Sequence, residues 1–297
     1  MIRAMPAIKI VYILLIGLQL SCLSAFAQTR RALVIGLGKQ EDTSWSKING
    51  DMDVPIVMDM LARSGYEKKC IITLVNQQAT KGRIVNAFNA LIRSCQLNDI
   101  IYIHFSGHGQ RVTDIDGDEE DGWDESWIPY DAYRDYCVWD NGEKHLIDDE
   151  IYHFLMEIKR RIGSRGKILV VADACHSGDS SFGLIEFSNN TILPIFNDIT
   201  IRGISTPFKI PHKSSSKKIK KAEQWLILSA CQSFETNQEM NNPHVGILSY
   251  ALYTISKKES LEMKKIEEFI RLNKGPYPQT PILKGEAEKY KISDVLK

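Results

Sequence analysis

Two short glycine-flanked motifs carry side chains that could do nucleophilic chemistry. One holds a histidine, in Ser-Gly-His108-Gly, and the other a cysteine, in Asp-Ala-Cys175-His-Ser-Gly. A thiolate becomes a strong nucleophile when a neighbouring base takes its proton, and imidazole is well suited to that task. We therefore predict that Cys175 is a nucleophile and that His108 is its general base.

Each motif directly follows an apolar run that is typical of a buried strand. Residues 99–105 lead to His108, and residues 167–172 lead to Cys175. Sites in parallel sheets lie just beyond the carboxyl ends of the strands, so neighbouring strands would present both side chains at one edge. The flanking glycines let the backbone turn sharply. The backbone N–H groups of Cys175 and Gly109 could then stabilise an oxyanion.

Apolar strands alternate with helices along the rest of the chain. This order predicts an α/β fold with a mostly parallel sheet and helices on both of its faces. The expected strands cover residues 31–38, 71–75, 99–105, 167–172 and 224–230. The expected helices cover residues 54–64, 80–93 (with Thr80 as N-cap), 148–162, 246–256 and 261–272.

The composition is that of an ordinary globular protein without a dominant charge. The 297 residues include 37 Lys+Arg and 37 Asp+Glu, so no global field favours a nucleic acid or a membrane as partner. No glycine-rich phosphate loop follows a strand, and Gly36-Leu-Gly38 lacks the third glycine of a dinucleotide site. We therefore expect no organic cofactor.

The N-terminus is typical of a signal peptide over residues 1–27. A basic start is followed by an apolar run at residues 10–20, too short to span a bilayer, and by Ala-Phe-Ala27. We expect cleavage after Ala27 and export to the periplasm or the medium. Cys22 offers a lipoprotein alternative, although Gln19 stands where such sites usually carry Leu.

Five cysteines remain after the expected cleavage. An odd number in an exported protein indicates at least one unpaired thiol, and the spacing leaves the pairing of the others open. The five are Cys70, Cys95, Cys137, Cys175 and Cys231.

The two motifs resemble those of the caspase and metacaspase family of cysteine peptidases, and are nearer to the metacaspases. Asp148-Asp149-Glu150 and Ser229-Ala-Cys-Gln232 extend the resemblance, which covers about residues 31–285. It implies a caspase-like three-layer sandwich with a six-stranded sheet and endopeptidase activity on peptides or proteins. It also implies one peptidase domain at 28–297, made of a large part at 31–187, an exposed linker at 188–223 and a small part at 224–297.

The resemblance also suggests which residues select the substrate. In the metacaspase branch, the Asp two residues before the catalytic cysteine belongs to the specificity pocket. Here that residue is Asp173. We also expect Ser106 to bind the substrate. A second pocket Asp follows the first strand, where Asp53 is the candidate and Asp51 the alternative. Buried carboxylates select basic side chains, so cleavage after Arg or Lys is expected. The Lys-rich residues 213–221 would then be a self-cleavage target, or a solvated loop that is never cut.

An acidic segment at residues 114–125 suggests calcium. It is not an EF-hand, because Glu119 stands where that loop requires glycine. The resemblance implies a different calcium site formed by Asp124, Asp148 and Asp149, to which Asp179 could add a fourth carboxylate. Carboxylate oxygens suit calcium, but a solvated acidic loop is the alternative.

Other interpretations of these residues stay open. Cys175 could be an inert buried thiol, and His176 is a rival base, although adjacent residues in an extended segment point to opposite sides. Cys231 and His104 are interpreted as structural. At the level of function, the alternatives are a caspase-fold binding or scaffold protein without proteolysis, and a peptidase that cuts after Asp.

Overall fold

The computed structural model describes residues 28–114, 117, 119, 122–175, 200–203, 206–211, 224–233, 235–258 and 260–296. The predictions for the signal peptide, His176, Asp179 and the Lys-rich residues 213–221 therefore lie outside the described residues. Within these ranges, no helix is both long enough and apolar enough to cross a membrane.

A six-stranded sheet forms the centre of the molecule, in the order β11-β8-β7-β3-β1-β2. Five strands of this sheet run parallel to one another, namely β1, β2, β3, β7 and β8, whereas β11 pairs antiparallel with β8 at one edge. The predicted α/β fold with a mostly parallel sheet is confirmed. The strands are β1 (Arg30–Gly36), β2 (Ile71–Val75), β3 (Ile100–Ser106), β7 (Lys167–Asp173), β8 (Leu226–Ser229) and β11 (Ile282–Gly285).

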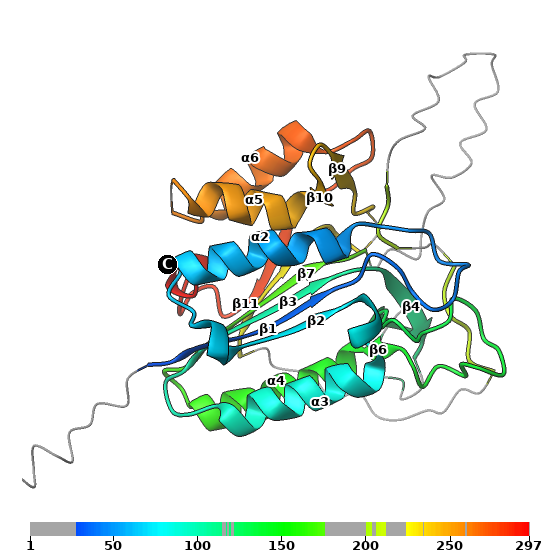
Figure 1. Ribbon diagram of the computed structural model, residues 1–297, viewed down its shortest axis with the longest axis horizontal. Helices are drawn as coiled ribbons and strands as arrows, with labels where there is room; N and C mark the ends of the chain where they lie inside the picture. The colour runs from blue at the N-terminus through cyan, green and yellow to red at the C-terminus, as the bar shows by residue number, and fades with distance from the viewer. Residues whose placement is uncertain are drawn as a thin grey trace, which may run out of the picture.

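Helices cover both faces of this sheet (Figure 1). On one face lie α2 (Gly50–Arg63), α5 (Ile247–Ser256) and α6 (Met263–Asn273), and on the other lie α3 (Lys81–Ser94) and α4 (Asp148–Ile162). Successive residues of a strand point to opposite faces, and so Val34 packs in the first core and Leu33 in the second. Because both faces are covered, the central strands β1, β3 and β7 are almost entirely apolar and buried.

The predicted helix at 54–64 starts earlier than expected. Helix α2 begins at Gly50, where a side chain would collide with the carbonyl oxygens of Leu37 and Ser106. A glycine is therefore required for the helix to start against the carboxyl ends of β1 and β3. Asp53, which we expected on a loop, consequently lies in the first turn of α2.

Several short elements were not predicted. A three-stranded antiparallel sheet and a two-stranded hairpin flank the carboxyl edge of the main sheet. Their strands are too short and too polar to show an alternating apolar pattern. They are β4 (Gly109–Thr113), β5 (Trp123–Trp127), β6 (Leu146–Ile147), β9 (Glu239–Asn241) and β10 (His244–Gly246), and the 3₁₀ turns are η1 (Lys68–Cys70), η2 (Asn76–Gln78) and η4 (Ile292–Asp294).

Candidate active site

The pairing of β3 with β7 brings the two motifs to one edge of the sheet. Ser106 and Asp173 are directly paired at the ends of these strands, and the N–H of Gly107 donates to the carbonyl of Asp173 at 3.4 Å. His108 and Cys175 each follow this pair by two residues. The register therefore places the predicted base and the predicted nucleophile at the same carboxyl edge.

The imidazole of His108 is fully buried and held in one orientation. Its Nε2 lies 2.7 Å from the carbonyl oxygen of Ser46, and its ring stacks on Trp45 with the centroids 4.9 Å apart. A carbonyl can only accept, so Nε2 carries the proton and Nδ1 keeps its lone pair. Nδ1 is buried and makes no hydrogen bond with the described residues. This nitrogen is the one that could take a proton from a thiol.

Burial decides the protonation state of this imidazole. Burial lowers the pKa of His108 to about 4. The hydrogen bond with the Ser46 carbonyl raises this pKa, and the positive charge of Arg202 lowers it further. The ring is therefore neutral near pH 7, which is the form that acts as a base. Neither Ser46 nor Trp45 was predicted, because a backbone carbonyl and a stacking partner leave no motif in the sequence.

The side chain of Cys175 is not hydrogen-bonded to His108 in this structure. Its Sγ donates instead to the carbonyl of Glu235 at 3.3 Å, and the Sγ of Cys231 lies 3.6 Å from the same oxygen. The backbone N–H of Cys175 donates to the carbonyl of Arg202 at 2.8 Å. Catalytic contacts often close only when the reaction is under way, and rotation about the Cα–Cβ bond reorients the thiol.

The predicted pocket residues gather around one arginine. The guanidinium Nη1 of Arg202 lies 2.8 Å from Asp53, 3.4 Å from Asp173 and 2.5 Å from the hydroxyl of Ser106. Ser106 in turn donates to Asp53 through a short hydrogen bond. All four side chains are fully buried. The structure thus brings together Asp53, Ser106 and Asp173, as the sequence analysis expected.

Asp51, the alternative to Asp53, faces elsewhere. Its carboxylate accepts a hydrogen bond from the side chain of Asn76 at 2.9 Å. Gly246 completes the pocket on the Asp53 side: its N–H donates to Asp53 at 2.8 Å. A side chain at Gly246 would collide with both Asp173 and the Arg202 guanidinium, so only glycine leaves room for an arginine here.

Glu239 is a third carboxylate of the pocket that the sequence analysis missed. It accepts a hydrogen bond from Nε of Arg202 at 2.8 Å, and the backbone N–H and side chain of Asn49 both donate to it. Glu239 lies in the short strand β9, far from either motif in the sequence. Nothing in its neighbourhood marked it as a pocket residue before the fold was known.

The carboxylates and the arginine set each other's charge. Burial raises the pKa of Asp53 to about 6. The positive charge of Arg202 lowers this pKa, whereas the negative charge of Asp173 raises it. Burial alone would also raise the pKa of Asp173, but Arg202 and hydrogen bonds from Ser249 and Asn237 lower it overall. Burial would lower the pKa of Arg202, but the carboxylates of Asp53, Asp173 and Glu239 raise it. The pocket therefore strongly favours a cation.

A chain of buried hydrogen bonds connects Asp173 to Ser249, His104 and Tyr102. The hydroxyl of Ser249 donates to Asp173 at 2.6 Å and lies 3.2 Å from Nε2 of His104, whose Nδ1 lies 2.8 Å from the hydroxyl of Tyr102. Burial lowers the pKa of His104 to about 4, so this imidazole is neutral. His104 is thus packed in the core, as we expected from the apolar residues around it.

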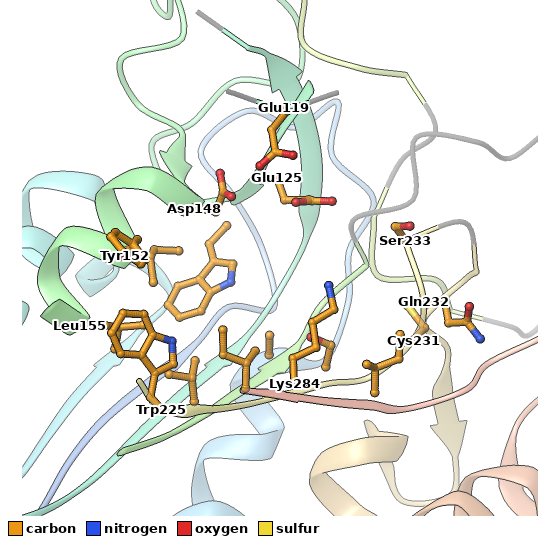
Figure 2. A pocket seen from close by; sticks show the side chains of 17 residues that line it. Glu119, Glu125, Asp148, Tyr152, Leu155, Trp225, Cys231, Gln232, Ser233 and Lys284 are labelled. Carbon is orange, nitrogen blue, oxygen red and sulfur yellow. The ribbon is translucent and has the colours of Figure 1, made fainter. Parts of the chain in front are cut away.

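A separate cavity of about 480 Å³ lies between α4, β5 and the side of the sheet formed by β8 and β11 (Figure 2). The carboxylates of Glu119, Glu125 and Asp148 lie at one end, and Trp225 lies with Tyr152 at the other. None of the residues around Arg202 lines this cavity. It is therefore distinct from the carboxylate pocket.

The prediction of a calcium site concerns Asp124, Asp148 and Asp149, which the structure describes, and Asp179, which lies outside the described residues. In the part of the chain that the structure describes, no group of three or more His, Cys, Asp or Glu side chains could hold a metal ion. We therefore derive no step through calcium. Calcium binding stays a prediction, which a chelator added to an active preparation would test.

No disulfide joins the described cysteines, which include all five of the expected mature chain. Cys231 lies close to Cys175, and a hydrogen bond with that thiol, together with burial, raises the pKa of Cys231 well above its ordinary value. The Cys231 thiol is thus held in its protonated form. This environment agrees with the structural role that we expected for it.

Known proteins match both the sequence and the fold. The family model of the metacaspase peptidase C14 domain matches residues 30–181, which make up about half of the chain. The chain belongs to this family. The metacaspase match therefore bears out the resemblance of the His108 and Cys175 motifs.

Metacaspases of fungi are among its relatives in sequence. Metacaspase-1B of Aspergillus fumigatus is 35% identical over 164 residues, which is 52% of this chain and 37% of that protein. Metacaspase-1 of Eremothecium gossypii is 32% identical over 159 residues, which is 51% of this chain and 32% of that protein. The matched region thus spans about a third of the length of these relatives.

Solved structures share the caspase-like fold of this metacaspase-family chain. A protein from Geobacter sulfurreducens superposes with a TM-score of 0.61 at 21% identity, over 91% of this chain and 97% of that one. Caspase-1 from Spodoptera frugiperda superposes with a TM-score of 0.54 at 10% identity, over 87% and 89%. At these identities the likeness concerns the fold alone, and it confirms the predicted caspase-like architecture.

Proposed function

We propose that this chain is a cysteine endopeptidase that hydrolyses peptide bonds after arginine or lysine. Cys175 is the nucleophile, His108 is the general base, and Asp53, Ser106, Asp173 and Glu239 bind the basic side chain before the cut. Membership of a peptidase family and the presence of both motif residues support the reaction. The carboxylate pocket supports the specificity.

One observation carries the proposal. An arginine side chain is fully buried among Asp53, Asp173 and Glu239, while its own carbonyl accepts a hydrogen bond from the N–H of Cys175 at 2.8 Å. This is the relation that a cysteine peptidase needs between its specificity pocket and the carbonyl that it attacks. A buried guanidinium is stable only where opposite charges surround it, so the pocket selects cations.

The residues divide the reaction between them. His108 takes the thiol proton at Nδ1, and the Cys175 sulfur attacks the carbonyl carbon, whose oxygen is stabilised by the N–H of Cys175 and, we propose, that of Gly109. His108 then gives the proton to the leaving amine. Water, activated by the same imidazole, hydrolyses the thioester. The Ser46 carbonyl keeps the ring in the tautomer that these steps require.

The pocket argues against the alternative specificity. Three buried carboxylates would repel an aspartate side chain, and an Asp-ended substrate would leave them without a cation. A scaffold without proteolysis would have no need of a neutral, oriented imidazole at the same edge of the sheet as the cysteine. The orientation of His108 therefore favours the enzyme.

A panel of peptide reporters that differ only in the residue before the cut tests the proposal. The wild type should release the reporter after Arg or Lys and not after Asp, Gln or Leu. Cys175→Ala should abolish the release while keeping its melting temperature, and Cys137→Ala, in a loop outside the site, should keep full activity. Equal release after Asp, or full activity in Cys175→Ala, would contradict the proposal.

We also propose that the chain is exported and loses residues 1–27. The apolar run and the Ala-Phe-Ala27 sequence support this. The intact mass of the protein isolated from its source tests the idea: it should begin at Gln28. A mature protein that still begins at Met1 would contradict it.

A further inference from the structure

Two thiols meet at the carboxyl edge of the sheet, and the proposed peptide hydrolysis uses only one of them. The Sγ of Cys175 lies 3.3 Å from the carbonyl oxygen of Glu235, and the Sγ of Cys231 lies 3.6 Å from the same oxygen. A hydrogen bond also joins the thiol of Cys231 to that of Cys175. The two sulfur atoms are therefore direct neighbours.

Strand pairing keeps the two cysteines together. Ala172 of β7 pairs with Ser229 of β8, and the N–H of Ala230 donates to the carbonyl of Ala172 at 3.0 Å. Cys175 and Cys231 follow shortly after this pair. Neighbouring strands lie about 4.8 Å apart, which is within the range of about 4.4–6.8 Å between Cα atoms that a disulfide bridges. The spacing of β7 and β8 therefore suits a disulfide between these two cysteines.

The acceptor that both thiols share is anchored on two sides. The N–H of Glu235 donates to the carbonyl of Gln232 at 3.0 Å, and its carboxylate accepts from the N–H of Gln232 at 3.2 Å. The same carboxylate accepts from the N–H and the hydroxyl of Thr280 at 2.6 and 2.8 Å. Because Glu235 is held by its backbone and by its side chain, its carbonyl keeps the two thiols oriented toward one point.

A small reagent can approach the two thiols through the cavity of about 480 Å³. Cys231 lines this cavity, together with Ala172 and Ser229, the paired residues near the ends of β7 and β8. Figure 2 shows Cys231 at one side of the cavity. Cys175 is only 1% exposed and is the neighbour of Cys231. The route to the pair thus lies on the α4 face of the sheet.

We propose that Cys175 and Cys231 form a site of reversible oxidation, at which a hydroperoxide joins the two sulfur atoms in a disulfide and so blocks the nucleophile. The formation of the disulfide needs only the two thiols and the oxidant. Its effect on peptide hydrolysis rests on the proposed peptidase function. The export that we propose brings the chain into surroundings where disulfides form and persist.

The oxidation proceeds in two balanced steps. The sulfur of Cys175 loses its proton to Nδ1 of His108 and attacks hydrogen peroxide, so that the O–O bond breaks, a sulfenic acid forms and one water leaves with that proton. The sulfur of Cys231 then attacks the sulfur of Cys175. The S–O bond breaks, and a second water leaves with the proton of the Cys231 thiol. The two sulfur atoms are oxidised, and both oxygen atoms of the peroxide are reduced.

The surroundings of each thiol determine its role. Cys175 shares its edge of the sheet with His108, so it is the thiol that can become the thiolate that a peroxide requires. The hydrogen bond with Cys175, together with burial, raises the pKa of Cys231, so this thiol keeps its proton until Cys175 is oxidised. Cys231 then captures the sulfenic acid before more peroxide converts it to a sulfinic acid, which thiols do not reduce.

Peptide mass mapping without reduction tests the proposal. The purified, fully reduced chain is treated with hydrogen peroxide, the remaining thiols are alkylated, and hydrolysis of Arg reporters is recorded in parallel. The wild type should lose two hydrogen atoms and yield one linked pair of peptides, which contain Cys175 and Cys231. Reporter hydrolysis should fall in proportion to the linked fraction, and dithiothreitol should restore both the thiols and the hydrolysis.

Two variants separate the disulfide from other oxidation. In Cys231→Ser, peroxide should add two oxygen atoms to Cys175, and dithiothreitol should not restore the reporter hydrolysis of the untreated variant. Cys95→Ser, which changes a buried cysteine at the end of α3, is the matched control and should form the disulfide as the wild type does. Melting temperatures show whether each variant is folded.

The outcomes distinguish this proposal from that of a peptidase. A treated wild type in which Cys175 and Cys231 stay unlinked, or in which another pair is linked, overturns the oxidation site. So does a wild type that forms sulfinic acid as fast as Cys231→Ser. If the disulfide forms but the reduced wild type hydrolyses no reporter, the oxidation site stands and the peptidase proposal falls. If Cys231→Ser does not fold, the peptide map of the wild type decides the question by itself.

Discussion

The carbonyl oxygen of Arg202 lies 2.8 Å from the backbone nitrogen of Cys175, while the guanidinium of the same arginine lies 2.8 Å from both Asp53 and Glu239. One residue thus links the predicted nucleophile to the predicted specificity pocket.

Replacing His108 tests the base. His108→Gln removes the lone pair at Nδ1, and loss of a general base lowers kcat by about 10²–10⁴-fold. KM for an Arg reporter should change little, because His108 does not contact Arg202. His153→Gln, an exposed histidine of α4, is the matched control and should keep the wild-type kcat. A His108→Gln enzyme with wild-type kcat would rule out this base.

Replacing Asp53 tests the pocket. Asp53→Asn removes one charge-assisted hydrogen bond to the substrate's basic group, and such bonds contribute about 1.5–3 kcal/mol, so kcat/KM for Arg reporters should fall about 10- to 100-fold. Asp59→Asn, on the same helix but exposed, should leave kcat/KM unchanged. Equal values of kcat/KM for Asp53→Asn and the wild type would place the pocket elsewhere.

Replacing Glu239 tests the choice between arginine and lysine. Glu239 accepts from Nε of the guanidinium, a donor that lysine lacks. In Glu239→Gln the ratio of kcat/KM for Arg to that for Lys reporters should therefore fall about tenfold, since a charge-assisted bond becomes a neutral one. Glu268→Gln on α6 is the exposed control. A ratio that does not change would show that Glu239 does not discriminate.

The buried histidines predict how stability depends on pH. Burial lowers the pKa of His104 and His108 to about 4, against 6.5 for the free side chain. Between these values the unfolded chain binds protons that the native chain excludes, so the free energy of unfolding should rise with pH. Asp53, with its pKa raised to about 6, binds a proton in the native state and opposes this trend, but it is one group against two.

Urea unfolding at several pH values between 4 and 6.5 measures this dependence. The midpoint should increase with pH, and His104→Gln should flatten the slope because one of the two groups is lost. The use of Cys175→Ala for all samples keeps the chain whole during the measurement. A midpoint that decreases over this interval would show that Asp53 outweighs the histidines.

Much of the fold could be predicted because its strands are buried on both faces. The apolar runs before His108 and Cys175 identified β3 and β7, and the parallel register of these strands then brought both motifs to one edge. The short strands β4, β9 and β11 were missed because they lie at edges or in polar segments, where no apolar pattern develops. Their positions depend on tertiary contacts.

Most of the predicted site residues lie at or just after the ends of β3 and β7, and Asp53 was predicted only from the family resemblance. Ser46, Glu239 and Arg202 come from three connections that the sequence leaves featureless, and each reaches the site through the fold of a distant segment. Ser46 contributes a backbone carbonyl, which has no sequence signature. Arg202 resembles any other basic residue in a long linker until its carboxylate partners are seen around it.

The most direct test of the central claim is the site at which a substrate-like reagent becomes attached. The wild-type protein is treated with a peptide acyloxymethyl ketone that ends in arginine, and the adduct is located by peptide mass mapping. One adduct on Cys175, absent after prior modification of that thiol, is the predicted result. An adduct on Cys231 or another cysteine, with Cys175 unmodified, would contradict the account.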